Sequence, residues 1–185
     1  HVIDPAEHIL VSTITGVSLE KIQRATTKSL PIIRSMPNTA AAISESMTCI
    51  CGNELANGHL KTVEKLFKSL GETLIIEERL MKAATVLAAS GIAFFLRYIR
   101  AATQGGIELG FEAEEAQKIA MQTARGAASL LVEGSAHPEM EIDKVTTPMG
   151  CTIAGLNEME HQGFSSAMIK GIVKASIKAG NLYEE

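Results

Sequence analysis

The sequence predicts an α/β domain over residues 1–77, followed by an all-helical domain over residues 78–185. Up to residue 77, short runs rich in β-branched residues alternate with segments whose apolar residues recur at helical spacing. Such alternation is typical of a parallel or mixed sheet covered by helices. From residue 78 onward the sequence shows no convincing strand pattern. The composition agrees, because aromatic residues make up only 4% of the chain and Trp is absent, which favours small aliphatic side chains packed between helices.

Four strands are expected in the first domain, at residues 9–14, 31–36, 47–50 and 73–76. Ser18 has the side chain of an N-cap residue and precedes the apolar positions of a short helix. A longer helix is expected over residues 55–70, and Gly71 suits the left-handed position that often follows a helix end.

Glycines at residues 91, 110, 134 and 163 divide the second domain into helices. We expect these helices over residues 78–89, 92–109, 112–133, 138–146, 152–162 and 165–182. One stripe of the third helix consists of small and aliphatic residues: Ala116, Ile119, Ala120, Thr123, Ala127 and Leu130. Because small side chains let neighbouring helices approach closely, the stripe is interpreted as a packing surface.

The uncharged stretch from Ala83 to Leu96 is shorter than the roughly 20 apolar residues that span a bilayer. It is interpreted as a buried helix pair and, since it is too apolar to face water, as part of a homodimer interface. The net charge of −4 is spread over both signs, so the sequence offers no basic face to nucleic acid or to a membrane. We therefore expect neither of these partners.

Three cysteines (Cys49, Cys51 and Cys151) form an odd number without the spacing of a zinc site. They are interpreted as reduced thiols of a cytoplasmic protein, and no metal site is expected. No signal peptide is visible, and the chain opens with His rather than Met, as expected if it begins partway into a longer protein.

The glycine fingerprint G-x-G-x-x-G, which places a pyrophosphate at a helix N-terminus, does not occur in the sequence. Gly105, Gly106 and Gly110 do not replace it, because they lie in a helical segment without a preceding strand. Either the protein binds no dinucleotide, or the first β-α-β unit lies upstream of His1.

Three ordered motifs are the most specific feature of the sequence. They are Arg34-Ser35-Met36-Pro37-Asn38-Thr39-Ala40, then Ala89-Ser90-Gly91-Ile92-Ala93-Phe94, and then Asp143-Lys144-Val145-Thr146-Thr147-Pro148-Met149-Gly150-Cys151-Thr152-Ile153-Ala154-Gly155-Leu156. Gly163-Phe164-Ser165-Ser166-Ala167 follows the third, and a small-residue segment at Thr13–Ser18 precedes the first. In order and separation this set resembles pyrroline-5-carboxylate reductases, and the likeness extends from about Ile9 to Tyr183.

The resemblance implies a fold, an activity and an assembly. The fold is the C-terminal part of a Rossmann-like NAD(P)-binding domain, followed by a dimerisation domain similar to the C-terminal domain of 6-phosphogluconate dehydrogenase. The activity is the reduction of 1-pyrroline-5-carboxylate to L-proline, the last step of proline biosynthesis, with NADPH or NADH as cofactor. The assembly is a homodimer or a higher oligomer, in which the helical domain interleaves with a second subunit.

The third motif carries the substrate site that the resemblance implies. Backbone N–H groups and hydroxyls at a helix start form an anion site without Arg, which suits the substrate carboxylate. By resemblance, Thr147 and the amides of Gly150 and Cys151 hold this carboxylate. Thr152 hydrogen-bonds the ring nitrogen as the catalytic residue, and Thr146 belongs to the same substrate-binding set. The alternative is that the three threonines only cap the helix.

Two strand ends are candidates for cofactor binding, because α/β sheets bind ligands at the carboxyl ends of their strands. The candidates are Thr15 and Gly16 at the first end, and Met36, Pro37, Asn38 and Thr39 at the second. A glycine lets the backbone approach a cofactor closely. Asn38 and Thr39 offer side chains to a nicotinamide or a ribose, and a plain Pro-Asn turn is the alternative for this segment.

Met149 departs from the family pattern, in which glycine is usual at this position. If the residue requires a positive φ, methionine carries a steric cost that glycine does not. Two alternatives to the leading function stay open. One is a related NAD(P)H-dependent reductase of another imine or a small oxo acid, and the other is a truncated, catalytically inactive dimerisation module.

Overall fold

The structure, a computed structural model, describes residues 3–26 and 29–180. The chain forms two compact units. The sheet unit comprises the chain up to Ile92 together with the residues from Gly171 onward, and the helical unit comprises Ala93–Lys170. The expected domain boundary between residues 77 and 78 falls inside the sheet unit and stays a prediction.

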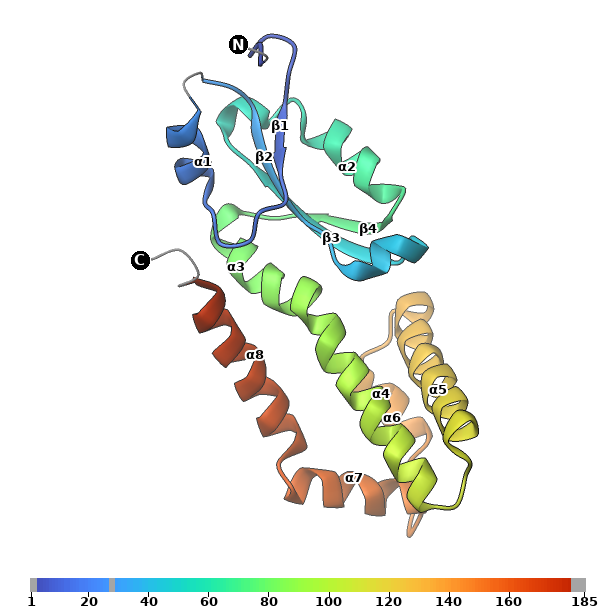
Figure 1. The fold of residues 1–185 in the computed structure, drawn as a ribbon. Helices are drawn as coiled ribbons and strands as arrows, with labels where there is room; N and C mark the ends of the chain where they lie inside the picture. The colour runs from blue at the N-terminus through green and yellow to red at the C-terminus, as the bar shows by residue number, and fades with distance from the viewer. Residues whose placement is uncertain (1–2, 27–28, 181–185) are drawn as a thin grey trace. The chain divides into compact units, whose positions relative to one another are not determined.

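The sheet has four strands in the order β1-β2-β3-β4 (Figure 1). Their bounds are Leu10–Ser12 for β1, Ile32–Met36 for β2, Ser46–Gly52 for β3 and Gly71–Ile75 for β4. β1 is parallel to β2, β2 is antiparallel to β3, and β3 is parallel to β4. All four expected strands are therefore present, in a mixed sheet, although β1 is shorter and β3 longer than the sequence predicts.

β2 is buried along its whole length, because it has a neighbouring strand on each side and helices over both faces. One face carries a cluster of Leu30, Ile32, Met36 and Cys51 with Met81 and with Leu19 and Ile22 of α1 (Leu19–Ala25). The other face carries Ile33 and Ile50 with Ala56 and with Val63 and Phe67 of α2 (Leu60–Lys68). Figure 1 shows α1 and α2 on opposite sides of the sheet.

The expected helix over residues 55–70 is shorter than predicted, since α2 begins only at Leu60. A separate 3₁₀ turn, η2 (Glu54–Ala56), precedes it, and Asn53 caps this turn by accepting from the Ala56 N–H. Gly58 lies between the two elements, where its low helix propensity favours a break. Gly71 has the expected positive φ, but at 134° it opens β4 and is not in the left-handed helical conformation.

The expected helix pair at 78–89 and 92–109 is one continuous helical run, Glu78–Glu108. The run consists of η3 (Glu78–Leu80), α3 (Met81–Ala84), the π-helical segment η4 (Thr85–Ser90) and α4 (Gly91–Glu108). Gly91 does not interrupt it, because its φ of −53° is that of an α-helix. Ser90 and Gly91, the two residues expected to break the helix, are the last residue of the π-helical segment and the first residue of α4.

Within the described part of the chain, the run Glu78–Glu108 is long and apolar enough to cross a membrane when judged by length and composition alone. Only 22% of its most apolar window is buried in the chain. The helix pair that was expected to be buried is therefore largely exposed in the single chain, and its place in a homodimer interface stays a prediction. Leu87 and Phe95 are two of its exposed apolar side chains.

The remaining helices agree closely with the sequence. They are α5 (Ala113–Gly134), α6 (Pro138–Lys144), α7 (Cys151–His161) and α8 (Phe164–Gly180). Gly134 is the last residue of α5 and not a separator, and Ser135, with a φ of 52°, takes the left-handed position after it. The expected end of the last helix at residue 182 lies outside the described residues.

The small-residue stripe on α5 packs as expected, because Ala116 and Ala120 are buried. A Cβ atom placed on Gly106 of α4 would lie 2.9 Å from the Cβ of Ala116. α4 and α5 therefore approach so closely that the contact tolerates no side chain at Gly106.

Candidate active-site residues

The candidate substrate loop is a tight turn that leads directly into α7. The Gly150 N–H donates to the Thr147 carbonyl at 2.9 Å, which closes a four-residue turn. Pro148 occupies its second position, and Met149, with a φ of 58°, its third. A proline followed by a residue with positive φ is the pattern of a type II turn. The steric cost that the sequence analysis attached to Met149 is therefore present.

The turn uses one of the amides that the sequence assigns to the substrate carboxylate. The Gly150 N–H would therefore have to share this bond with an anion, and its assignment to the substrate carboxylate stays a prediction. The Gly150 carbonyl accepts from Ala154 at 3.4 Å, so the first helical hydrogen bond of α7 begins there. The N–H groups of Cys151, Thr152 and Ile153 are the ones that the helix leaves without an internal partner.

The three threonines of the loop have different hydrogen bonds. The Thr146 hydroxyl donates to the Ile142 carbonyl at 2.7 Å and so closes the end of α6 rather than the start of α7. Across the described residues, the hydroxyls of Thr147 and Thr152 make no hydrogen bond, and the N-cap of α7 is Gly150 without a side-chain cap. Capping of α7 therefore does not explain Thr147 or Thr152, and both hydroxyls are available to a ligand.

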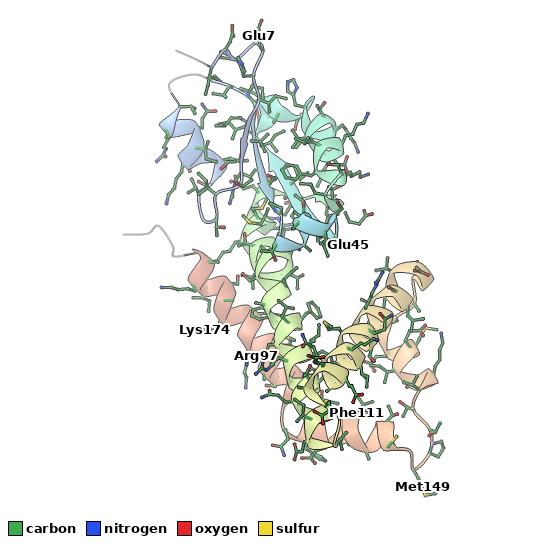
Figure 2. All side chains as sticks on the ribbon, turned by 45° about the vertical axis from the view of Figure 1, so that its right-hand side comes forward. Glu7, Glu45, Arg97, Phe111, Met149 and Lys174 are labelled. Carbon is green, nitrogen blue, oxygen red and sulfur yellow. The ribbon has the colours of Figure 1, made fainter. Side chains whose placement is uncertain are left out.

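The loop is open to solvent in the single chain. Thr147 and Cys151 are exposed, and Thr152 is partly buried at the first turn of α7. Met149 is fully exposed, with a relative accessible surface of 102%. Figure 2 shows its side chain at the tip of the loop, directed away from the surrounding helices. The assignment of Thr146, Thr147, Gly150, Cys151 and Thr152 to substrate binding stays a prediction.

Replacing Met149 by glycine is expected to raise the free energy of unfolding by about 0.5–1 kcal/mol, because glycine adopts a positive φ without a Cβ clash. The exposed Met side chain contributes no packing that this change would remove. Met149→Ala keeps the Cβ and is expected to stay within a few tenths of a kcal/mol of the wild type. Urea unfolding of the three proteins measures the difference. Equal stabilities of the Gly and Ala variants would contradict a strained turn.

The two candidate cofactor segments lie next to each other in the sheet unit. The Thr15 hydroxyl is 3.9 Å from the Met36 sulfur, which joins the loop after β1 to the end of β2. Gly16 has a φ of 79°, so this loop needs a glycine for its backbone conformation. Parallel β1 and β2 bring their carboxyl ends to the same edge, as the prediction required.

Asn38 uses its whole side chain to hold the second segment. Its Oδ1 accepts from the Ala40 N–H at 2.9 Å and caps η1 (Thr39–Ile43), whereas its Nδ2 donates to the Ala88 carbonyl at 3.2 Å. These bonds favour the Pro-Asn turn, the alternative that the sequence left open, for the Asn38 side chain. Pro37 and Thr39 remain accessible, while Met36 is buried.

An ion pair that the sequence analysis did not single out lies beside these segments. Arg34 of β2 is 7% exposed, and its Nη1 lies 3.3 Å from Oε1 of Glu78. An arginine between buried apolar residues of a strand was the available signal, because such a charge needs a partner. Its partner could not be read from the sequence, since Glu78 is far away along the chain.

The buried thiols of the sheet carry no nucleophilic chemistry. Burial raises the pKa of Cys51 to about 11, a rise that Arg34 opposes and the Glu78 carboxylate reinforces. Burial also raises the pKa of Cys49. Both thiols therefore stay protonated near neutral pH. Among the residues with described positions, no group of three or more His, Cys, Asp or Glu side chains could hold a metal ion.

Comparisons with known proteins show the family of the chain. A family model described as pyrroline-5-carboxylate reductase dimerisation matches residues 78–182, more than half of the chain. Pyrroline-5-carboxylate reductase 1 of Dictyostelium discoideum is 52% identical over 96% of this chain and 34% of its own length. The chain spans between about a third and two thirds of the length of the curated relatives it matches.

Solved structures show the same fold. The 1-pyrroline-5-carboxylate reductase of the human pathogen Streptococcus pyogenes matches with a TM-score of 0.89 and 34% identity, over 95% of this chain and 68% of that one. Plasmodium falciparum pyrroline carboxylate reductase with NADP bound matches with a TM-score of 0.89 and 24% identity, over 95% of this chain and 71% of that one. The mixed sheet followed by a helical part is thus a fold shared with these reductases, and the chain belongs to the pyrroline-5-carboxylate reductase family.

Proposed function

We propose that this protein reduces the C=N bond of 1-pyrroline-5-carboxylate to give L-proline, with NADPH or NADH as the reductant. The observation that carries the proposal is the start of α7, where three N–H groups lack internal partners and the Thr147 and Thr152 hydroxyls make no bond within the described chain. Amides at a helix start bind carboxylates without a cationic side chain. A small amino acid with a ring imine fits this set of groups.

The chain's own residues would grip and orient the substrate. The Cys151 amide and the Thr147 hydroxyl hold the carboxylate, while the Thr152 hydroxyl, close to them on the first helical turn, hydrogen-bonds the ring nitrogen. A threonine hydroxyl is too weak an acid to supply the proton at neutral pH. We therefore assign Thr152 the orientation of an already protonated imine, or the relay of a proton from solvent.

The cofactor segments fit a nicotinamide cofactor in one specific respect. Gly16 adopts a positive φ in a loop that touches Met36, so a planar ring can approach the backbone where no Cβ stands. The cofactor, when bound, supplies the hydride for the imine carbon. Of the proteins with this fold, that of Plasmodium falciparum has been solved with NADP bound.

We propose a homodimer for this protein, formed through the helical unit. Apolar side chains on its helices and in the turn after α4 are exposed in the single chain: Phe95, Leu96, Leu109, Ile119 and Leu130. A groove of about 1230 Å³ runs between α4, α5 and α7 and is lined mainly by apolar groups. A second copy covering such surface is the expected occupant, because the matching family model describes a dimerisation domain. A stable monomer in light scattering at micromolar concentration would contradict this.

We further propose that the protein works in the cytoplasm without nucleic acid or membrane partners. Its three cysteines are free, which suits a reducing compartment. The charge is mixed in sign, and the apolar run of Glu78–Glu108 lies within the segment that matches the dimerisation model.

One observation favours a related reductase as the second candidate. Met149 has a φ of 58° in the turn directly before Gly150, so a Cβ atom stands in the proposed substrate loop where glycine would leave none. Another imine or a small oxo acid would then be the preferred substrate. An inactive dimerisation module is the third candidate, because the matching family model describes dimerisation.

The test is NADPH oxidation by the full-length protein with 1-pyrroline-5-carboxylate, a series of cyclic imines and small oxo acids. Proline formation with a higher kcat/KM than for any other substrate supports the proposal. Faster turnover of another imine or an oxo acid, with poor turnover of 1-pyrroline-5-carboxylate, supports the second candidate. The lack of any turnover by a correctly folded dimer supports the third.

A further inference from the structure

One carboxylate oxygen of Glu78 forms hydrogen bonds to a residue near each of the two candidate cofactor segments. Oε1 of Glu78 accepts from the Leu19 N–H at 2.6 Å and from Nη1 of Arg34 at 3.3 Å. Leu19 lies just after the Gly16 turn, and Arg34 lies just before Met36. We propose that Glu78 is a positioning residue that fixes the two cofactor segments relative to each other, an inference that rests on the proposed function.

The burial of Arg34 makes Glu78 difficult to replace. The guanidinium is almost completely buried, and its Nε is without a partner among the residues that the structure describes. A buried charge requires an opposite charge, so moving the Glu78 carboxylate away would leave Arg34 uncompensated. The same oxygen accepts from the Leu19 N–H. Because Arg34 keeps the carboxylate in position, the carboxylate in turn holds the start of α1 in place.

The geometry around the pair places it beside the first cofactor segment. Gly16, Arg34 and Glu78 line one cavity of about 190 Å³, together with Lys82. Glu78 is therefore the acidic group of a small cluster that has two cationic neighbours. A displacement of its side chain would be transmitted to the Gly16 turn within the same cavity.

The second segment has an additional anchor on the same helical run. The Ala88 carbonyl accepts from Nδ2 of Asn38 at 3.2 Å and holds the Pro37–Thr39 loop from the other side. This bond does not reach the first segment. Glu78 is thus the side chain that joins α1, β2 and the start of the helical run, and its loss affects the first segment most.

Glu78→Gln tests this role, because the amide keeps the size of the side chain and can still accept from Leu19, but it loses the charge that Arg34 requires. Glu77→Gln is the matched control, since it removes the same charge one residue away. Within the described residues the ion pair of Glu77 is with exposed Arg79. Glu78→Asp keeps the charge at a shorter reach and is measured beside them. All variants are made in the full-length protein.

The expected result is an increase of about tenfold in the Kd of NADPH for Glu78→Gln, measured by fluorescence titration, with the KM for the imine changed less than about twofold. Glu78→Asp is expected to shift the Kd in the same direction. Hydrogen exchange without cofactor should be faster at residues 15–19 in both variants. Glu77→Gln should match the wild type in each measurement.

Unchanged Kd and exchange rates in both Glu78 variants would overturn the positioning role. A loss of active protein with normal Kd in the remaining fraction would also overturn it, since it would show a purely structural residue. Wild-type protein that reduces no imine would refute the proposed function instead. The inference would in that case be decided by the exchange rates at residues 15–19, which need no cofactor.

Discussion

Gly71→Ala is expected to lower the free energy of unfolding by about 3–5 kcal/mol, enough to unfold many domains of this size. Gly71 opens β4 with a φ of 134°, a conformation that L-residues rarely adopt. A Cβ on this residue would lie 2.2 Å from the Ser46 carbonyl oxygen and 2.4 Å from the Ser46 nitrogen. Because both atoms are backbone of the paired strand β3, no side-chain rotation can relieve the clash.

Gly58→Ala is the control for this experiment. Gly58 lies in an exposed turn, its φ is not positive, and a Cβ there would meet no atom within 4 Å. Urea unfolding followed by circular dichroism measures both variants. A Gly71→Ala protein whose free energy of unfolding lies within about 0.5 kcal/mol of the wild type, as for an ordinary surface substitution, would show that β3 and β4 do not pair as described.

Thr152→Ala is expected to lower kcat for imine reduction roughly 10- to 100-fold in the full-length protein, because a hydrogen bond to a charged group contributes about 1.5–3 kcal/mol. The Thr152 hydroxyl makes no bond within the described chain, and so its loss should leave stability almost unchanged. Thr147→Ala is expected mainly to raise KM, because Thr147 is assigned to the carboxylate and not to the reacting nitrogen. Steady-state kinetics with saturating NADPH separate the two effects.

Thr62→Ala is the matched control for both threonine variants. Thr62 is an exposed residue of α2 and lies in the sheet unit, far along the sequence from the substrate loop. Its kinetics should equal those of the wild type. If Thr147→Ala and Thr152→Ala also behave like the wild type, neither hydroxyl belongs to the active site, and the assignment of the α7 start fails.

Local patterns were sufficient to predict most of the elements. β2 was predicted because five consecutive residues are buried between two strands and two helix layers, which leaves a compact apolar run in the sequence. The long helices were predicted for a similar reason, since their apolar positions recur at helical spacing. The end of α6 and the start of α7 were located by the turn residues between them.

The sheet direction could not be read from the same patterns. The antiparallel pairing of β2 with β3 depends on the short η1 connection, in which Asn38 caps a 3₁₀ turn. Neither residue spacing nor composition distinguishes a connection that leads to an antiparallel strand from a crossover that leads to a parallel one. The continuity of the helical run was missed because Ser90-Gly91 has the composition of a break, yet the π turn accommodates it.

The assignment of residues 146–152 to the substrate stays a prediction, and the hydrogen bonds within this loop were only partly predicted. That the Gly150 N–H is paired follows from the turn geometry, which requires the positive φ of Met149. The contacts of Glu78 could not be predicted from the sequence for a different reason. Its partners Leu19 and Arg34 lie 59 and 44 residues away, and no local pattern encodes a contact at such separation.

Because β2 and β3 run in opposite directions, the end of β3 lies at the edge of the sheet where β2 begins. Asn53, just after β3, binds the Ile32 N–H and the Leu30 carbonyl, which belong to the start of β2. The turn around Gly58 therefore lies at the opposite end from Met36 and the cofactor segments. A fluorophore attached through Gly58→Cys would report folding of the sheet at the end opposite the segments that are proposed to bind the nicotinamide.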